Sequence, residues 1–92
     1  MSDIHTGQML RLRFDTGQDL TSASNKKILY NKPDGTAGGW TATAELTTFL
    51  YYDTAEADLD QPGMWKLQTY CEIAGKKLYG DIVVENVKLK LN

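Results

Sequence analysis

The chain has 92 residues, of which 41% are hydrophobic and 24% charged, with a formal net charge of −2 and one cysteine. This length suits a single domain, residues 1–92, and excludes a TIM barrel, a kinase or a two-domain dehydrogenase. The weakly acidic composition argues against the basic face of a DNA-binding module, so we expect no nucleic-acid partner. A lone cysteine excludes a disulfide-stapled mini-protein.

The start of the chain lacks the basic region and apolar run of a signal peptide. No apolar stretch approaches the roughly 20 residues that span a bilayer. We therefore expect synthesis in a cytoplasm and no membrane partner.

The dominant period of the hydrophobic residues is two, which predicts strands. In residues 9–14, apolar side chains alternate with cations, so one face of this strand would join the core and the other would be solvated. The core candidates are Leu10, Leu12 and Phe14, and the solvated cations are Arg11 and Arg13.

The middle of the chain predicts three more short strands. Residues 27–32 end at a Pro-Asp-Gly turn, because proline fixes φ and Asp-Gly suits a tight reversal. Residues 40–45 alternate again, and residues 47–52 are rich in Thr, Phe and Tyr, which favour strands. The connection between these two runs is short, so we expect antiparallel neighbours.

Residues 53–62 are the only stretch with helical character, and they predict one turn capped by Asp53 or Thr54. Acidic side chains concentrate here, at Asp53, Glu56, Asp58 and Asp60. Such carboxylates can hold calcium, but their spacing lacks the glycine and the final glutamate of an EF-hand loop. A solvated connection is favoured, and we predict no metal or other cofactor.

The last third of the chain predicts two long strands. Residues 65–73 form the clearest strand, and residues 74–77 form a hairpin connection. Residues 78–91 form the closing strand, with a bulge or break near residues 83–85, where the alternation changes parity. About six to eight short strands with regular turns predict one all-β sandwich or small barrel. The core candidates of the 65–73 strand are Trp65, Leu67 and Cys71.

For each residue that could serve in catalysis or ligand binding, a structural role is the favoured interpretation. His5 has no cysteine or second histidine nearby, so an exposed side chain is favoured over a metal or catalytic site. Cys71 is favoured as a small buried hydrophobe. The glycines at residues 35–39 precede no Lys-Ser/Thr pair, so they form no phosphate loop. We predict no enzymatic activity, because no nucleophile or acid–base pair can be assembled.

The aromatic run formed by Phe49, Tyr51 and Tyr52 is denser than one strand face requires. Successive strand residues point in opposite directions, so at least one of Tyr51 and Tyr52 should lie outside the core. Exposed tyrosine is enriched at interfaces, which makes Tyr51 and Tyr52 the candidate interface residues.

Three stretches of the chain are distinctive. They are residues 3–7 (Asp-Ile-His-Thr-Gly), residues 28–35 (Ile-Leu-Tyr-Asn-Lys-Pro-Asp-Gly) and residues 58–68 (Asp-Leu-Asp-Gln-Pro-Gly-Met-Trp-Lys-Leu-Gln). Together they resemble the immunoglobulin-like domains of tailed-phage structural proteins, most closely the N-terminal domain of upper baseplate proteins. The resemblance implies an immunoglobulin-like antiparallel β-sandwich. It places Trp65 where a tyrosine locks the sandwich corner, and Leu67 where antibody domains carry a cysteine.

The resemblance also implies a function: a non-enzymatic structural or docking protein of a bacteriophage or prophage tail or baseplate. The protein would be assembled in the host cytoplasm and reside in the virion. Its partners would be other tail or baseplate proteins or itself, as a homo-oligomer. The alternative is a small carbohydrate-binding or adhesion module that uses exposed aromatics such as Trp40, Tyr51 and Tyr79 as a stacking platform.

Overall fold

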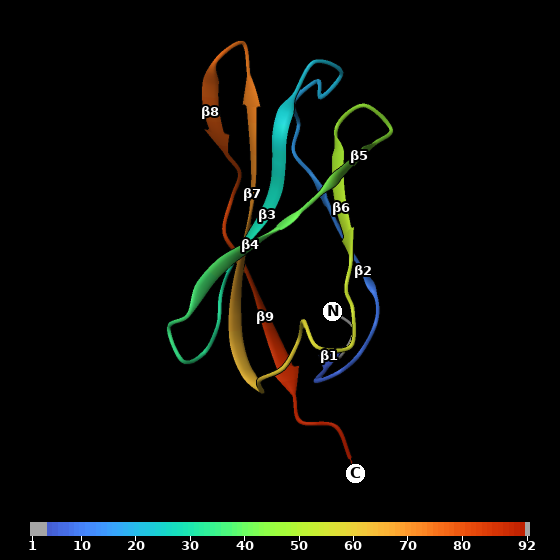
Figure 1. Ribbon diagram of the computed structural model, residues 1–92, viewed down its shortest axis with the longest axis vertical. Coiled ribbons are helices and arrows are strands. Elements are labelled where there is room, and N and C mark those ends of the chain that lie inside the picture. Colours follow the sequence, from blue (N-terminus) through green and yellow to red (C-terminus); the bar gives the residue numbers. More distant parts are fainter. Residues whose placement is uncertain (1–3, 92) are drawn as a thin grey trace.

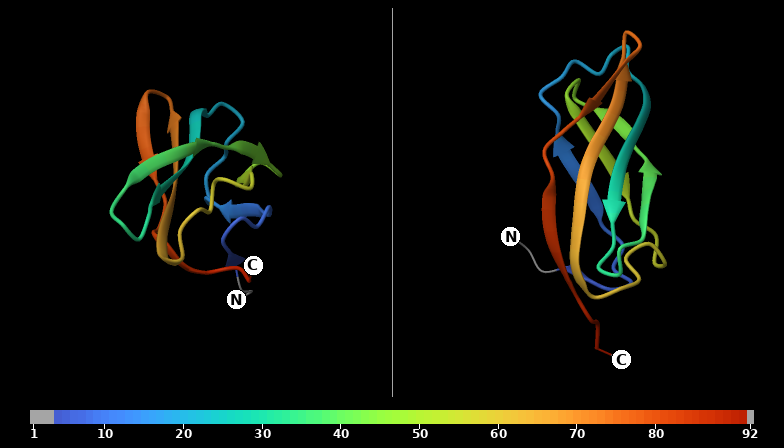
Figure 2. Two further views of the ribbon diagram at one scale, coloured as in Figure 1. Left: turned by 60° about the horizontal axis from the view of Figure 1, so that its bottom comes forward. Right: turned by 90° about the vertical axis from the view of Figure 1, so that its left-hand side faces the viewer.

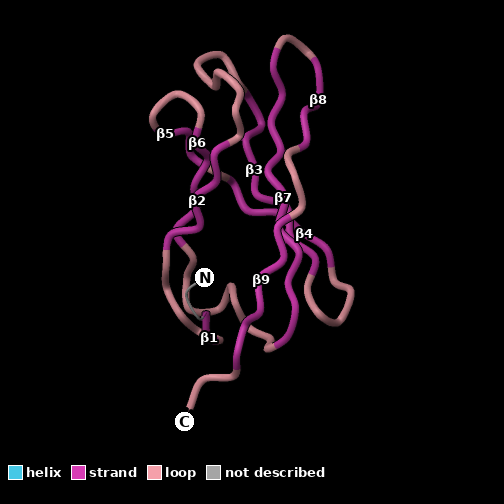
Figure 3. Tube along the Cα trace, turned by 180° about the vertical axis from the view of Figure 1, so that it is seen from behind, coloured by secondary structure: helices cyan, strands magenta, loops and turns pink. Residues whose placement is uncertain are grey.

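The computed structural model describes residues 4–91, and within that range the chain consists of strands and loops without a helix (Figure 3). The first residue of the 3–7 stretch, Asp3, lies outside the described residues. Nine strands are present in residues 4–91: β1 (Ile4–His5), β2 (Arg11–Asp15), β3 (Ser24–Asn31), β4 (Ala37–Thr41), β5 (Thr43–Glu45), β6 (Phe49–Asp53), β7 (Gly63–Ile73), β8 (Lys76–Tyr79) and β9 (Val83–Lys88). The all-β prediction is confirmed. In this part of the chain, no helix is long and apolar enough to cross a membrane.

The strands form two sheets that pack as a β-sandwich (Figure 1; Figure 2, right). The larger sheet has the order β1-β9-β7-β3-β4, and β8 also pairs with β7. The smaller sheet has the order β2-β6-β5. Strand β1 runs parallel to β9, and the other pairs are antiparallel. Because sequence neighbours often lie in different sheets, side chains from distant segments meet in the interior.

The single strand predicted for residues 40–45 is wrong, because the chain changes sheets in its middle (Figure 1). Strand β4 pairs with β3 in the larger sheet, and β5 pairs with β6 in the smaller one. The buried Ala42 stands between them and donates its N–H to the carbonyl of Lys26. The alternation continues through the crossing, because the inner faces of both sheets border the same core. The antiparallel pairing of β5 with β6 is as predicted.

The closing strand is also broken, at residues 80–82 rather than at 83–85 as predicted. In the β8 register Tyr70 faces Tyr79, and in the β9 register Leu67 faces Val83. Three steps along β7 thus correspond to four along the partner, and this one extra residue explains the change of parity. Strand β9 ends at Lys88, so the predicted extension to residue 91 is wrong.

The hairpin between β7 and β8 turns on two residues. Ala74 and Gly75 both have positive φ, 53° and 77°, and Ile73 faces Lys76 across the turn. Positive φ at both central residues is typical of a type I′ turn, whose twist matches that of the flanking strands. The predicted hairpin is therefore confirmed, with a shorter turn than the 74–77 range.

The core between the sheets is built around aromatic rings. Trp40 stacks on Tyr52 with centroids 5.0 Å apart and lies 6.3 Å from Trp65. The indole N–H of Trp65 donates to the carbonyl of Gln61 at 2.9 Å, so a fully buried side chain also ties down the loop before β7. Of the predicted core residues, Trp65, Leu67, Cys71 and Leu12 are buried, while Leu10 and Phe14 are partly buried and pack against them.

Residues 53–62 form one hydrogen-bonded turn but no helix, and the predicted caps are wrong. The N–H of Ala55 donates to Asp58 Oδ2 at 2.7 Å, so the acceptor is the last residue of the turn and not one that precedes it. Thr54 is buried, and its hydroxyl oxygen accepts the N–H of Leu10 at 3.0 Å. Thr54 therefore fastens this loop to the start of β2.

Candidate functional site

The outer face of the smaller sheet carries cations, aromatic rings and carboxylates in neighbouring strands. Alternation along β2 turns its arginines outward while Leu12 enters the core. The antiparallel register sets Arg13 opposite Tyr51, and Tyr51 opposite Thr43 of β5. The arginine–aromatic face consists of Arg11, Arg13, Glu45, Phe49, Tyr51 and Asp53.

Each arginine lies over an aromatic ring. The guanidinium carbon of Arg11 is 3.9 Å from the centroid of the Tyr51 ring, and that of Arg13 is 3.8 Å from the Phe49 centroid. A planar guanidinium suits this stacking, which contributes about 0.5–1 kcal/mol at exposed sites. The stacks leave both rings only half-buried, so a mixed surface of ring and cation faces solvent.

Carboxylates hold both arginines in place. Arg11 donates from Nε and Nη2 to the two oxygens of Asp53, at 2.7 and 3.0 Å. Arg13 donates from Nε to Glu45 Oε1 at 2.8 Å. The hydrogen bond from Arg11 holds the pKa of Asp53 below its ordinary value. Exposed ion pairs add little stability, but they restrict the rotamers of long side chains and leave other guanidinium N–H groups for a partner.

The two candidate interface tyrosines lie on opposite sides of β6. Tyr51 belongs to the arginine–aromatic face, whereas the ring of Tyr52 stacks on Trp40 inside the sandwich. The hydroxyl of Tyr52 donates to Asp58 at 2.7 Å, and this bond, with burial, raises the pKa of Tyr52 to about 12. Tyr51 alone is therefore placed for contact with a partner.

Sequence reasoning did not assign the other members of this face. The pattern predicts only that Arg11 and Arg13 are solvated, and it connects neither Glu45 nor Asp53 with them. The alternations in residues 9–14 and 47–52 contain the signal, since the first places Arg11 and Arg13 on one side of its strand and the second places Phe49 and Tyr51 on one side. The missing information was the pairing of β2 with β6, which joins segments about forty residues apart (Arg11 with Asp53).

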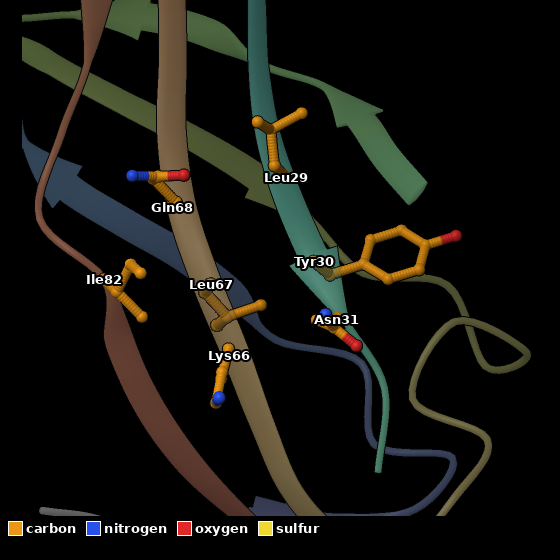
Figure 4. Close-up of a pocket in the computed structure, with 7 residues that line it drawn as sticks. All are labelled: Leu29, Tyr30, Asn31, Lys66, Leu67, Gln68 and Ile82. Atoms are coloured by element: carbon orange, nitrogen blue, oxygen red, sulfur yellow. The ribbon is translucent and has the colours of Figure 1, made fainter. Parts of the chain in front are cut away.

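Two of the hollows formed by residues 4–91 open on the outer face of the larger sheet. The first, about 200 Å³, lies between β3, β7 and Ile82, which precedes β9, and is shown in Figure 4. Its lining includes Leu29, Ile82, Gln68 and Lys66, and none of the lining residues is a carboxylate, serine, cysteine or histidine. The second, about 380 Å³, is lined by Asn25, Lys27, Leu29, Tyr70, Glu72 and Tyr79.

The second hollow combines rings with a hydrogen-bonded carboxylate. The Tyr70 and Tyr79 rings have centroids 5.1 Å apart. Glu72 accepts hydrogen bonds from the Tyr70 hydroxyl at 2.5 Å and from Asn25 Nδ2 at 3.0 Å. The bond to Glu72 raises the pKa of Tyr70 to about 12, and the two bonds together lower the pKa of Glu72. This is a polar, partly aromatic surface suited to hydroxylated ligands.

The remaining candidate residues do not come together into a site. His5 is exposed, and burial raises the pKa of the Cys71 thiol. Members of the acidic run have separate partners: Asp53 binds Arg11, and Asp60 binds Lys32 at 3.1 Å. Among residues 4–91, no three His, Cys, Asp or Glu side chains are grouped to hold a metal ion. Trp40 is 8% exposed, so the expectation that it forms an exposed stacking platform is wrong.

No protein-family model matches this chain, and no curated protein sequence matches it.

Proposed function

We propose that this chain is a non-enzymatic docking protein that acts through protein–protein contacts made by its arginine–aromatic face. The observation that carries the proposal is the pair of guanidinium–ring stacks, each held by a carboxylate. Arginine and aromatic side chains dominate the binding energy of many protein interfaces. Rotamers that are held before the partner arrives lower the entropic cost of binding.

We further propose that the partners are tail or baseplate proteins of a phage or prophage. The support is the resemblance of residues 3–7, 28–35 and 58–68 to immunoglobulin-like tail proteins. Two structural features agree with such a fold. The β2-β6-β5 and β9-β7-β3-β4 sheets follow the B-E-D and G-F-C-C′ orders of immunoglobulin sandwiches. The Trp65 indole bonds to the backbone of Gln61, as a corner tyrosine does.

The test is the presence of the chain in purified particles from the phage or prophage that encodes it. Tagged wild-type chain is expected in the particles at a constant ratio to the major tail protein. The double variant Arg13→Ala/Tyr51→Thr should fold and be lost from them. Tyr79→Ala, on the other sheet, is the control and should be retained. Absence of the wild-type chain, or retention of the double variant, would refute the proposal.

A second candidate function is carbohydrate binding at the hollow beside Tyr70 and Tyr79. The two rings offer faces for the C–H groups of a sugar, and Glu72 and Asn25 offer hydrogen-bonding groups for its hydroxyls. A glycan array should then give hits that Tyr79→Ala abolishes and Tyr51→Thr leaves unchanged. An array without hits would remove this candidate.

A further inference from the structure

Within residues 4–91, no strand pairs with the outer edge of β4, so its backbone groups are exposed. Two backbone hydrogen bonds mark the ends of the β3–β4 ladder. The N–H of Lys32 donates to the carbonyl of Thr36 at one end, and the N–H of Ala42 donates to the carbonyl of Lys26 at the other. In an antiparallel ladder the bonded pairs alternate, so every second residue of β4 bonds to β3. The residues in between turn their N–H and C=O groups to the free side of the sheet: they are Ala37, Gly39 and Thr41, and all three are exposed.

This edge lacks the usual protection against pairing. Proteins protect edge strands with charged side chains, proline, bulges or short length. In the described range, the other edge strands longer than two residues carry charges: β2 has arginines, β5 has a glutamate and β8 has two lysines. Strand β4, with the sequence Ala-Gly-Gly-Trp-Thr, has no charge and no proline. A five-residue ladder is therefore open to another strand.

The two glycines of β4 differ in what the fold requires of them. A Cβ at Gly38 would collide with the ring of Tyr30, so the packing of the core excludes a side chain there. A Cβ at Gly39 would come closest to a methyl group of Leu29, at 3.1 Å, with the Ile28 carbonyl oxygen and Lys27 Cδ at 3.8 Å, and Gly39 has no positive φ. Glycine inside a strand costs stability, and it often marks the close approach of another backbone.

We propose that the β4 edge pairs antiparallel with the β4 edge of a second copy of this chain, about a two-fold axis at Gly39. In this register Gly39 faces its own counterpart, and Ala37 faces Thr41 of the second copy. Each of these residues donates one backbone hydrogen bond and accepts one. The interface is isologous and closes at two chains. It lies on the larger sheet, so it is independent of the docking function proposed for the smaller sheet.

Charge complementarity selects the second copy and the antiparallel direction. Asp34 lies in the turn that precedes β4, and Lys27 is opposite Thr41 at the other end of the strand. Antiparallel pairing brings the Asp34 end of one copy to the Lys27 end of the other. Parallel pairing would instead set like charges together. The opposite signs at the two ends therefore fit the same strand in reversed direction.

The first experiment measures mass in solution against protein concentration. The wild-type chain is expected to reach twice the monomer mass, and Gly39→Pro should weaken dimerisation at least about tenfold. Proline removes an N–H that faces away from β3, so the fold should persist, as far-UV circular dichroism can check. Lys77→Pro is the matched control, because the N–H of Lys77 faces away from β7 in the same way. A monomeric wild type, or a Gly39→Pro protein that dimerises normally, would overturn the proposal.

A second experiment tests register and direction by oxidative cross-linking. Gly39→Cys should cross-link to itself, because directly opposite residues lie within disulfide range. Ala37→Cys should cross-link to Thr41→Cys in a mixture, and not to itself. Self-linking of Ala37→Cys would indicate parallel or shifted pairing and would overturn the proposed geometry. The charge-reversed pair Asp34→Lys/Lys27→Glu should dimerise, whereas each single change should weaken dimerisation.

Discussion

The two faces of β6 use the same residue type for different purposes. Tyr52 turns inward, stacks on Trp40 with planes 7° apart and bonds to Asp58. Tyr51, the preceding residue, turns outward beneath Arg11. The inner ring is fixed by packing between two sheets, whereas the outer ring is fixed only by an exposed stack. The direction of each side chain, inward or outward, therefore decides which tyrosine stabilises the fold and which is free to bind.

The largest effect is expected from a change on the inner face opposite β6. Trp65→Ala removes a fully buried ring from the aromatic cluster and should lower the free energy of unfolding by about 3–5 kcal/mol. Urea denaturation followed by far-UV circular dichroism measures this loss. Trp65→Phe keeps most of the ring but loses the bond to Gln61, so its loss should be smaller. An unchanged midpoint for the alanine variant would contradict the importance of the inner face.

Tyr52→Phe separates the ring from its hydroxyl and should lower the free energy of unfolding by about 1–2 kcal/mol. Tyr70→Phe is the matched control, because its hydroxyl also bonds a carboxylate but on the outer face. The control variant should lose less free energy of unfolding than Tyr52→Phe. Equal losses from the two variants would show that the position of the bond does not matter.

The same bond predicts a dependence on pH. The native pKa of Tyr52, about 12, lies above its ordinary value of 10.0, so the native state favours the protonated phenol. This stabilisation is complete below pH 10.0 and is lost as the pH rises through about 12. The stability difference between wild type and Tyr52→Phe should therefore shrink in that range. A difference that stays constant across it would contradict the assignment.

Glu85 is an acidic residue on the inner face, opposite Trp65, and burial raises its pKa. A raised native pKa means that Glu85 favours folding below its unfolded pKa, and that this contribution disappears as the pH rises through the native value. Glu85→Gln should therefore raise the free energy of unfolding at neutral pH by on the order of 1 kcal/mol or less. The melting temperature measures this gain. The stability difference between Glu85→Gln and the wild type should become smaller in mild acid, where Glu85 is protonated. A less stable variant at neutral pH would point to a favourable role for the charge.

The smallest effect on stability is expected from the outer face of β6. Tyr51→Thr keeps a residue that favours strands and should change the free energy of unfolding by about 0.5 kcal/mol. The same denaturation experiment measures this change. A loss as large as that of Trp65→Ala would show that the outer face is part of the structural core and not a surface kept for binding.

Period-two patterns predicted much of the fold because the interior of a sandwich sorts each strand into two faces. The alternation in residues 65–73 placed Trp65, Leu67 and Cys71 on the buried side of β7. The same rule does not reveal the crossing at Ala42, because an inward-facing residue has the same place in the alternation whichever sheet it belongs to. It also extended the last strand too far: Leu89 and Leu91 alternate with lysines, yet they are 70% and 98% exposed. Local pattern does not reveal whether a second layer is present to cover a side chain.

The amino-acid sequence by itself determined the all-β class, most strand positions, a hairpin within residues 74–77 and the inward or outward direction of most side chains. These features depend on neighbours one or two residues apart, where backbone sterics and alternation act. Only the tertiary structure decided that Arg11 meets Tyr51 and Asp53, that Tyr52 meets Asp58 across the end of its strand, and that β4 is left as an uncharged edge. The physical reason is that strand pairing brings together segments far apart in the chain, and no local pattern specifies which strands become neighbours.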